Sequence, residues 1–343
     1  MMAQRTSIEW TRGADGSPGA TWNPIVGCSI VSPGCTNCYA MSMARRIEAM
    51  QPTTHYAGTT QVVNGNAVWT GKVALAPERI LTQPLRWQKP RKIFVNSMGD
   101  LFHEAVPVEW IDRTFAVMND ATWHDFQVLT KRPGRMRAYL TDEATNERIA
   151  DAQVSMGLDV HVNTPARNIW LGTSVEDQHR ADERREDLSA LAGDRWRTFV
   201  SYEPARGPVD WTGWEFLSWL ISGGESGNRA RPSDPDWHRA ARDFCAAHGI
   251  PYLFKQWGEW LPLGQSGFTQ WTALTRGDGT LIYHDIWRGH AHFNDGAGGP
   301  ETHVIGPVKT HSRASCLSAR IGKRAAGRLL DGIEYNGMPG APQ

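Results

Sequence analysis

Short apolar runs recur along the middle of the chain, each followed by a polar or glycine-containing turn and then by a stretch with helical spacing. The runs occupy residues 92–95, 126–129, 169–172, 198–200, 219–221 and 251–254, and a further run at 20–22 precedes them. Helical spacing covers residues 108–119, 133–140, 178–191 and 237–248. Strands that alternate with helices predict a parallel sheet, and therefore an α/β fold.

Six or seven strand and helix units of this kind predict a partial or complete (β/α) TIM-like barrel, with a doubly wound open sheet as the alternative. We expect the barrel to occupy residues 1–257, with an insertion at 49–91. Beyond Gly258 the chain becomes rich in Gly, Asp, Thr and His. This change predicts a C-terminal extension, 258–343, with a hairpin around residues 276–279 and a basic helix at 318–330.

Polar side chains follow every predicted strand, at the ends that gather at one edge of a parallel sheet. Such residues also cap helices, but a complete rim of them favours a binding site. Basic side chains at or after these ends are expected to hold a phosphate or carboxylate, or else to pair with local carboxylates such as Asp234 and Asp236. They are Lys131, Arg132, Arg229, Arg231 and Lys255. Two aromatic residues there, Tyr202 and Trp257, are expected to stack on a base.

Three cysteines lie close together near the start of the chain, with six residues between Cys28 and Cys35 and two between Cys35 and Cys38. Three thiolates on one loop can hold three corners of a [4Fe-4S] cluster and leave the fourth iron free for another ligand. The alternative is a zinc site completed by His55 or His103, although the usual second ligand pair is missing from the sequence. Of the two remaining cysteines, Cys245 has the surroundings of a core thiol, and Cys316 is isolated.

Composition narrows the class of protein further. The charges of the 36 basic and 36 acidic side chains cancel, so the protein has no net positive charge that would attract polyanions such as nucleic acids to its whole surface. No stretch approaches the roughly 18 apolar residues of a membrane span, and the N-terminus lacks the apolar core of a signal peptide. Five cysteines, three of them clustered, are typical of a reducing compartment. We therefore expect a cytoplasmic protein without a membrane partner; the pattern sets no oligomeric state.

The cysteine triad after the first strand, ending in CxxC, resembles that of the radical S-adenosylmethionine enzymes. Several stretches resemble more closely an uncharacterised, phage-associated family with the same three-cysteine motif. They are residues 6–10, 21–24, 28–40, 97–103, 129–133, 223–227 and 254–258. Three features depart from the superfamily: the first cysteine spacing is six rather than three, Asn37 stands where an aromatic residue is frequent, and a Gly-Gly-Glu tripeptide at 223–225 follows strand six instead of strand two.

The resemblance implies that Cys28, Cys35 and Cys38 ligate a [4Fe-4S] cluster whose unique iron chelates S-adenosylmethionine. An electron from an external donor of the flavodoxin or ferredoxin type then cleaves the sulfonium and yields a 5′-deoxyadenosyl radical. By position in the strand order, the implied cofactor-binding residues are Tyr39, Ser97, Asp100, Ser174 and Glu176.

On the substrate side, we expect Glu225, Lys255 and Glu203 to be catalytic. The phage association favours a nucleotide or DNA base as substrate, modified or rearranged in the host cytoplasm if the protein is phage-encoded. Two other classes stay open: a zinc-dependent TIM-like hydrolase that uses Glu176, Glu203 and Glu225, and a non-catalytic binding protein stapled by a metal.

Overall fold

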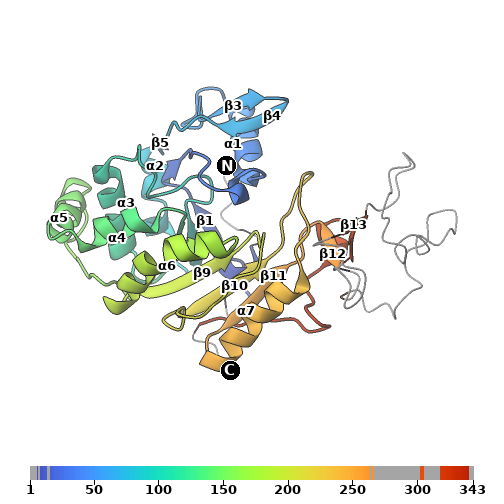
Figure 1. Cartoon of the computed structure of the whole chain (residues 1–343). Coiled ribbons are helices and arrows are strands. Elements are labelled where there is room, and N and C mark those ends of the chain that lie inside the picture. The colour runs from blue at the N-terminus through green and yellow to red at the C-terminus, as the bar shows by residue number, and fades with distance from the viewer. Residues whose placement is uncertain are drawn as a thin grey trace, which may run out of the picture. The chain divides into compact units, whose positions relative to one another are not determined.

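The computed structural model describes residues 6, 8–13, 16–262, 265, 302–304 and 317–339. Its main feature is a seven-stranded sheet whose strand order follows the chain order (Figure 1). The strands are β1 (Ala20–Trp22), β6 (Lys92–Val95), β7 (Asp125–Thr130), β8 (Ile169–Ser174), β9 (Arg197–Tyr202), β10 (Trp219–Gly223) and β11 (Tyr252–Gln256). Strand pairing is parallel. All seven predicted strands are present, and the predicted α/β fold with the topology of a partial TIM-like barrel is confirmed.

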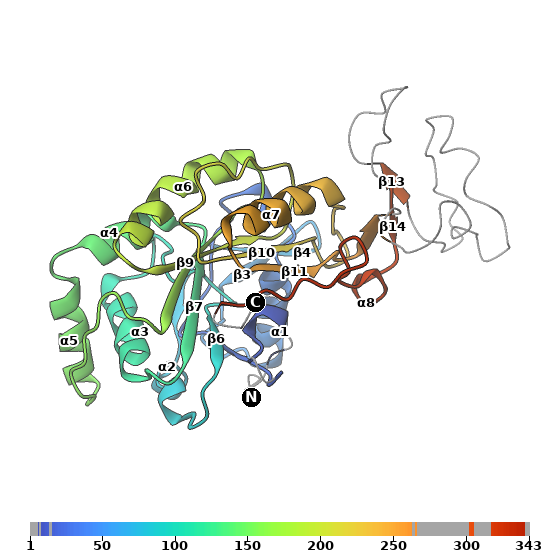
Figure 2. The ribbon, with the colours of Figure 1, turned by 90° about the horizontal axis from the view of Figure 1, so that it is seen from below.

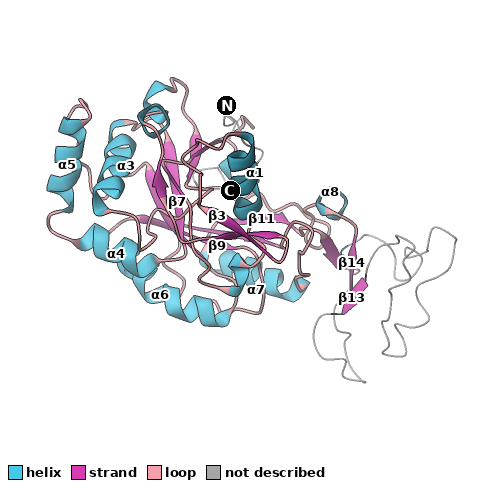
Figure 3. Ribbon diagram, turned by 90° about the horizontal axis from the view of Figure 1, so that it is seen from above, coloured by secondary structure: helices cyan, strands magenta, loops and turns pink. Residues whose placement is uncertain are grey.

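Helices occur at all four predicted positions, as α3 (Val108–Asp120), α4 (Pro133–Thr141), α6 (Gln178–Gly193) and α7 (Pro235–His248). Helix α1 (Tyr39–Met50) begins directly after the third cysteine, and α5 (Thr145–Ser155), which was not predicted, lies beside α3 (Figure 3). Within the described residues, no helix combines the length and apolar character that a bilayer crossing requires.

The chain forms two compact units. The first comprises residues 1–174, 182–201 and 213–219, and the second comprises 175–181, 202–212 and 220–343. Aromatic packing fills the core of the first unit, where the Trp10 ring lies 4.6 Å from Phe94 and about 6 Å from Phe199 and Trp219, measured between centroids. The expected division at residue 257 stays a prediction.

The expected insertion, residues 49–91, packs on the helix that follows the cysteines. A hairpin of β3 (Thr60–Val63) and β4 (Asn66–Trp69) lies against α1 (Figure 1), and β5 (Ala74–Leu75) pairs with β2 (Ile25–Val26). The one-turn helices α2 (Glu78–Leu81) and η3 (Pro84–Arg86) follow. Tyr56, Trp69 and Met98 contribute to a buried cluster with α1, and Cys28 and Cys38 pack against it.

In the second unit, the C-terminal tail lies antiparallel along β11 (Figure 2). The Phe254 amide donates to the Tyr335 carbonyl at 3.0 Å, and the Trp257 amide donates to the Gly327 carbonyl at 3.1 Å. β12 (Trp260–Pro262) and β13 (Thr302–Val304) flank β14 (Leu317–Arg320) in a small sheet.

The predicted basic helix at 318–330 is wrong for most of its length. Its first residues belong to strand β14, and only the single turn α8 (Lys323–Ala326) is helical. Pairing with two neighbouring strands outweighs the local helical pattern, because sheet partners that are distant in sequence supply hydrogen bonds that the pattern does not encode. The predicted hairpin at 276–279 and Cys316 lie outside the described residues.

Helix α7 carries a buried histidine, His238. His238 has no exposed surface, and its two ring nitrogens face the hydroxyls of Ser222 and Ser233. Burial lowers the pKa of His238 to about 3, so the ring is neutral in the folded protein near pH 7.

Folding stability is therefore expected to depend on pH through His238. Below the ordinary histidine pKa of about 6.5, the unfolded chain binds a proton that the folded chain excludes. The free energy of unfolding should thus fall as pH drops from 6.5 toward 3, by up to about 1.4 kcal/mol per pH unit. Urea unfolding between pH 7.5 and 4.5 measures this slope. His238→Gln should make the slope smaller, and His248→Gln, at the exposed end of α7, should retain it. Some slope should remain in His238→Gln, because burial also lowers the pKa values of His55, His103 and His124. Equal slopes in wild type and His238→Gln would contradict the expectation.

Candidate functional site

The cysteine loop begins with a backbone turn that only glycine accommodates. Gly27 has φ +91°, and a Cβ atom there would overlap the carbonyl oxygen of Lys72. The Gly27 amide donates to the Met98 carbonyl at 3.1 Å, and the Gly71 amide donates to the Cys28 carbonyl at 3.2 Å. The start of the loop is therefore fixed both to the segment after β6 and to the insertion.

The three cysteines are free thiols on three successive local structures. Cys28 follows β2, Cys35 ends the short helix η2 (Pro33–Cys35), and Cys38 caps α1. Burial raises the pKa of the Cys28 thiol to about 12; the negative charges of Asp100 and of the other two cysteines add to this, while Arg132 opposes it. Burial also raises the pKa of Cys38, with a contribution from Cys35. The charges of neighbouring thiols therefore act on both Cys28 and Cys38.

Thiolates are the protein ligands of iron–sulfur clusters, so the chemistry of this donor set fits such a cluster. In the part of the chain that the structure describes, no three His, Cys, Asp or Glu side chains are gathered as a single ion requires. Zinc would need its donors about 2–2.3 Å from one point, whereas cysteines that ligate different irons of a cube need not converge on one atom. His103, a proposed zinc ligand, instead has Nε2 3.0 Å from the hydroxyl of Ser29.

A buried arginine lies against the first cysteine. The Arg132 guanidinium donates through Nη1 to Asp100 Oδ2 at 3.0 Å, and the same nitrogen lies 3.8 Å from Cys28 Sγ. Its Nε donates to Glu104 Oε1 at 2.7 Å, and its Nη2 donates to the Ser29 hydroxyl at 2.7 Å. Arg132 was expected either to hold a substrate phosphate or carboxylate or to pair with local carboxylates. The second alternative is confirmed, with Asp100 and Glu104 as its partners.

Asp100 accepts four hydrogen bonds from the protein itself. Oδ1 accepts from the Thr130 hydroxyl at 2.6 Å and from the Phe102 amide at 3.0 Å. Oδ2 accepts from the Lys131 amide at 3.1 Å and from Arg132. A carboxylate offers about four lone-pair positions, so these donors occupy its accepting capacity. Its expected contact with the ammonium of S-adenosylmethionine stays a prediction.

Two further predicted cofactor-binding residues lie beside the cysteine loop. Tyr39, in the first turn of α1, is exposed, and its hydroxyl donates to the Ser97 carbonyl at 3.2 Å. The Ser97 hydroxyl donates to Asn23 Oδ1 at 3.1 Å. Ser174 is buried at the end of β8, where its carbonyl accepts from Arg184 at 2.6 Å.

The remaining predicted site residues belong to the second unit, where acidic and basic side chains pair. Lys255 Nζ lies 2.8 Å from both carboxylate oxygens of Glu203. Glu225 is buried and accepts from the Arg231 amide, Nε and Nη2 at 2.6–2.8 Å. Glu176 is fully buried, and its carbonyl accepts from the Arg206 amide at 2.7 Å.

Both predicted stacking residues are buried, so that prediction is wrong. Trp257 is 1% exposed and Tyr202 0% exposed. The Trp257 indole donates to the Leu329 carbonyl at 2.8 Å and its ring packs against Phe254, while the Tyr202 hydroxyl donates to the Gly207 carbonyl. An aromatic residue next to a polar turn can complete the core as readily as line a rim.

The structure also shows the partner of Arg231 and the surroundings of Cys245. Arg231 does pair with a local carboxylate, but this is Glu225 instead of Asp234 or Asp236. Asp234 caps α7, and Asp236 pairs with Arg239. Cys245 is fully buried, which confirms it as a core thiol.

Sequence reasoning missed Ser29 and Glu104, which contact Arg132, and did not identify which local carboxylates pair with it. The strand order could have predicted the pairing of Arg132 with Asp100. Because β6 and β7 are adjacent and parallel, the residues after their carboxyl ends meet at one edge of the sheet. Asp100 and Arg132 are the oppositely charged residues at those two ends.

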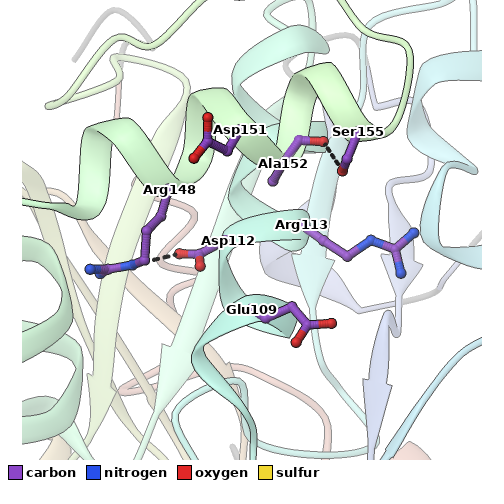
Figure 4. Close-up of a pocket in the computed structure, with 7 residues that line it drawn as sticks. All are labelled: Glu109, Asp112, Arg113, Arg148, Asp151, Ala152 and Ser155. Carbon is purple, nitrogen blue, oxygen red and sulfur yellow. Dashed lines mark hydrogen bonds and ion pairs between the residues drawn. The ribbon is translucent and has the colours of Figure 1, made fainter.

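A separate hollow lies between α3 and α5 of the first unit (Figure 4). Its seven labelled residues are Glu109, Asp112, Arg113, Arg148, Asp151, Ala152 and Ser155. Arg148 Nε faces Asp112 at 3.5 Å, and Asp112 also accepts from the Tyr139 hydroxyl at 2.7 Å. None of these residues belongs to the cysteine site, and the paired charges have a structural role between the two helices.

Comparison with known proteins gives remote structural similarity. Two structures of spore photoproduct lyase, one of a mutant and one of a complex with a dinucleoside spore photoproduct, match 72% and 65% of this chain at 10% and 11% identity, with TM-scores of 0.37 and 0.30. A phosphodiesterase, PaMucR in complex with c-di-GMP, matches 43% at 10% identity, with a TM-score of 0.25. The matches span 79%, 60% and 61% of those chains, respectively.

No curated protein matches the chain. A family model described as "Protein of unknown function (DUF5131)" matches residues 5–339, which is nearly the whole sequence and includes all three clustered cysteines. The chain therefore belongs to the DUF5131 family.

Proposed function

We propose that this protein is a radical S-adenosylmethionine enzyme in which Cys28, Cys35 and Cys38 hold a [4Fe-4S] cluster. One observation carries the proposal: three free thiols lie on one loop, and two of them, Cys28 and Cys38, pack against the same buried cluster. When bound, such a cluster supplies the electron that cleaves S-adenosylmethionine to methionine and a 5′-deoxyadenosyl radical.

The chain's own residues prepare this site. Gly27 and its backbone partners fix the first cysteine, and α1 carries the third at its N-terminus. Burial of the thiols against the Tyr56 and Trp69 cluster excludes water from one side of the loop. Exposed Tyr39, tied to Ser97, offers an aromatic face next to Cys38 for the adenine of the cofactor.

Anaerobic reconstitution with iron and sulfide tests the proposal. We expect a brown protein with iron and sulfide in the ratio of a [4Fe-4S] cluster, which produces 5′-deoxyadenosine from S-adenosylmethionine in the presence of dithionite. A colourless protein that binds one zinc ion, or a clustered protein that leaves S-adenosylmethionine intact, would contradict it.

The finer predictions are a nucleotide or DNA base as substrate, a flavodoxin or ferredoxin type electron donor, and Glu203, Lys255 and Glu225 as catalytic residues. Glu203 and Lys255 lie at the carboxyl ends of β9 and β11, where parallel sheets bind ligands, and this position supports a polar substrate contact in the second unit. Glu225 has less support, since Arg231 occupies its carboxylate.

A further inference from the structure

Arg132 contacts both a cysteine of the triad and the carboxylates around it. Its side chain is only 6% exposed, although a guanidinium is costly to bury without partners. Four different residues receive its donors: Cys28, Ser29, Asp100 and Glu104. The N–H donors of a guanidinium point in fixed directions, like a fork, so these partners hold the Arg132 guanidinium in one orientation. A flexible lysine amine cannot reproduce this arrangement.

We propose that Arg132 is a positioning residue that donates to the Cys28 sulfur and raises the reduction potential of the cluster, with Asp100 and Glu104 holding it in place. The inference rests on the proposed function, because it assumes that the cluster is present. A hydrogen bond to a ligand sulfur is one of the factors that set the potential of an iron–sulfur cluster. It stabilises the reduced cluster more than the oxidised one, since the added electron increases the negative charge on the sulfur.

The geometry assigns Asp100 a role that differs from cofactor recognition. Its Oδ2 lies 3.0 Å from the same Arg132 nitrogen that faces Cys28, and three further protein donors fix the carboxylate. Asp100 therefore orients the guanidinium toward the sulfur. Ser29, the residue after Cys28, receives the second terminal nitrogen, so the fork also restrains the cysteine loop.

The test is the midpoint potential of the reconstituted cluster, followed by electron paramagnetic resonance while dithionite supplies the single electron that reduces the cluster from the 2+ to the 1+ state. Arg132→Gln is expected to lower the potential by at least about 59 mV, which is a tenfold change in the ratio of reduced to oxidised cluster. Arg132→Lys keeps the charge without the fork and is expected to give a smaller decrease. The control is Arg135→Gln, in the first turn of α4, which Arg132 precedes, because Arg135 donates to the carbonyls of His103 and Val106 and to no cysteine among the described residues.

The outcomes separate this inference from the proposed function. A wild-type protein that assembles no cluster defeats the proposed function itself. A wild-type cluster whose potential is unchanged in Arg132→Gln overturns the inference and leaves the proposed function intact. Should Arg132→Gln fail to assemble a cluster, Ser29→Ala removes one restraint from Arg132 without altering any charge or any cysteine; a lowered potential supports the inference, and the wild-type potential overturns it.

Discussion

Alanine in place of Cys28, Cys35 or Cys38 is expected to reduce the iron content of the anaerobically reconstituted protein by an order of magnitude or more. Loss of a residue that only supports a metal ligand typically reduces metal affinity by about tenfold to hundredfold. Loss of the ligand itself should reduce it more, so a tenfold loss of iron is the minimum expected. Each variant should also lose the visible absorption of the cluster. Iron and sulfide assays with an absorption spectrum measure the effect.

Cys245→Ala is the matched control for these variants. Cys245 is fully buried in α7 and belongs to the second unit, whereas the three clustered cysteines belong to the first. It removes a thiol of the same chemistry and is expected to retain the wild-type iron content. Full iron retention in Cys28→Ala, Cys35→Ala and Cys38→Ala alike would show that the metal is held elsewhere.

Gly27→Ala is expected to destabilise the first unit by about 2–5 kcal/mol and to impair cluster assembly. The positive φ of this residue is strained for alanine, and the added methyl group would overlap the Lys72 carbonyl, so the insertion or the cysteine loop must move. Denaturant unfolding gives the stability, and iron content after reconstitution gives the second effect.

Gly65→Ala separates backbone strain from overlap. Gly65 also has a positive φ, +76°, but a Cβ atom there would meet nothing within 4 Å. We expect a cost of about 1 kcal/mol, from strain alone, with unchanged iron content. Equal costs at positions 27 and 65 would contradict the role given to the close approach of Lys72.

The strands and most helices were predictable because their signals are local. Apolar runs bounded by polar turns mark strands that are buried on both faces, and all seven runs became strands. The β3 and β4 hairpin was missed although its turn, Asn64-Gly65, has positive φ at both residues and is a strong local signal. Helix α5 was missed because its polar sequence buries few apolar side chains, Ile149 and Ala152 among them.

The position of the site was predictable from the sequence, but the pairing of its charged side chains was much less so. The sequence places polar residues at strand ends, but which charges meet depends on partners that are remote along the chain. Arg132 reaches Cys28 across 104 residues, and Lys255 reaches Glu203 across 52. Whether a carboxylate faces a substrate or an arginine is decided by such contacts, as Glu225 illustrates.

The tail that lies antiparallel along β11 has a consequence for truncated chains. A strand at the margin of a sheet presents unpaired amides and carbonyls to any passing chain, and proteins shield such margins to avoid self-association. Amide and carbonyl groups of residues 327–337 occupy those of β11 here. A chain that stopped before Gly327 would leave the backbone groups of β11 unpaired. We expect such a chain to aggregate, although its cysteine loop would have the wild-type sequence.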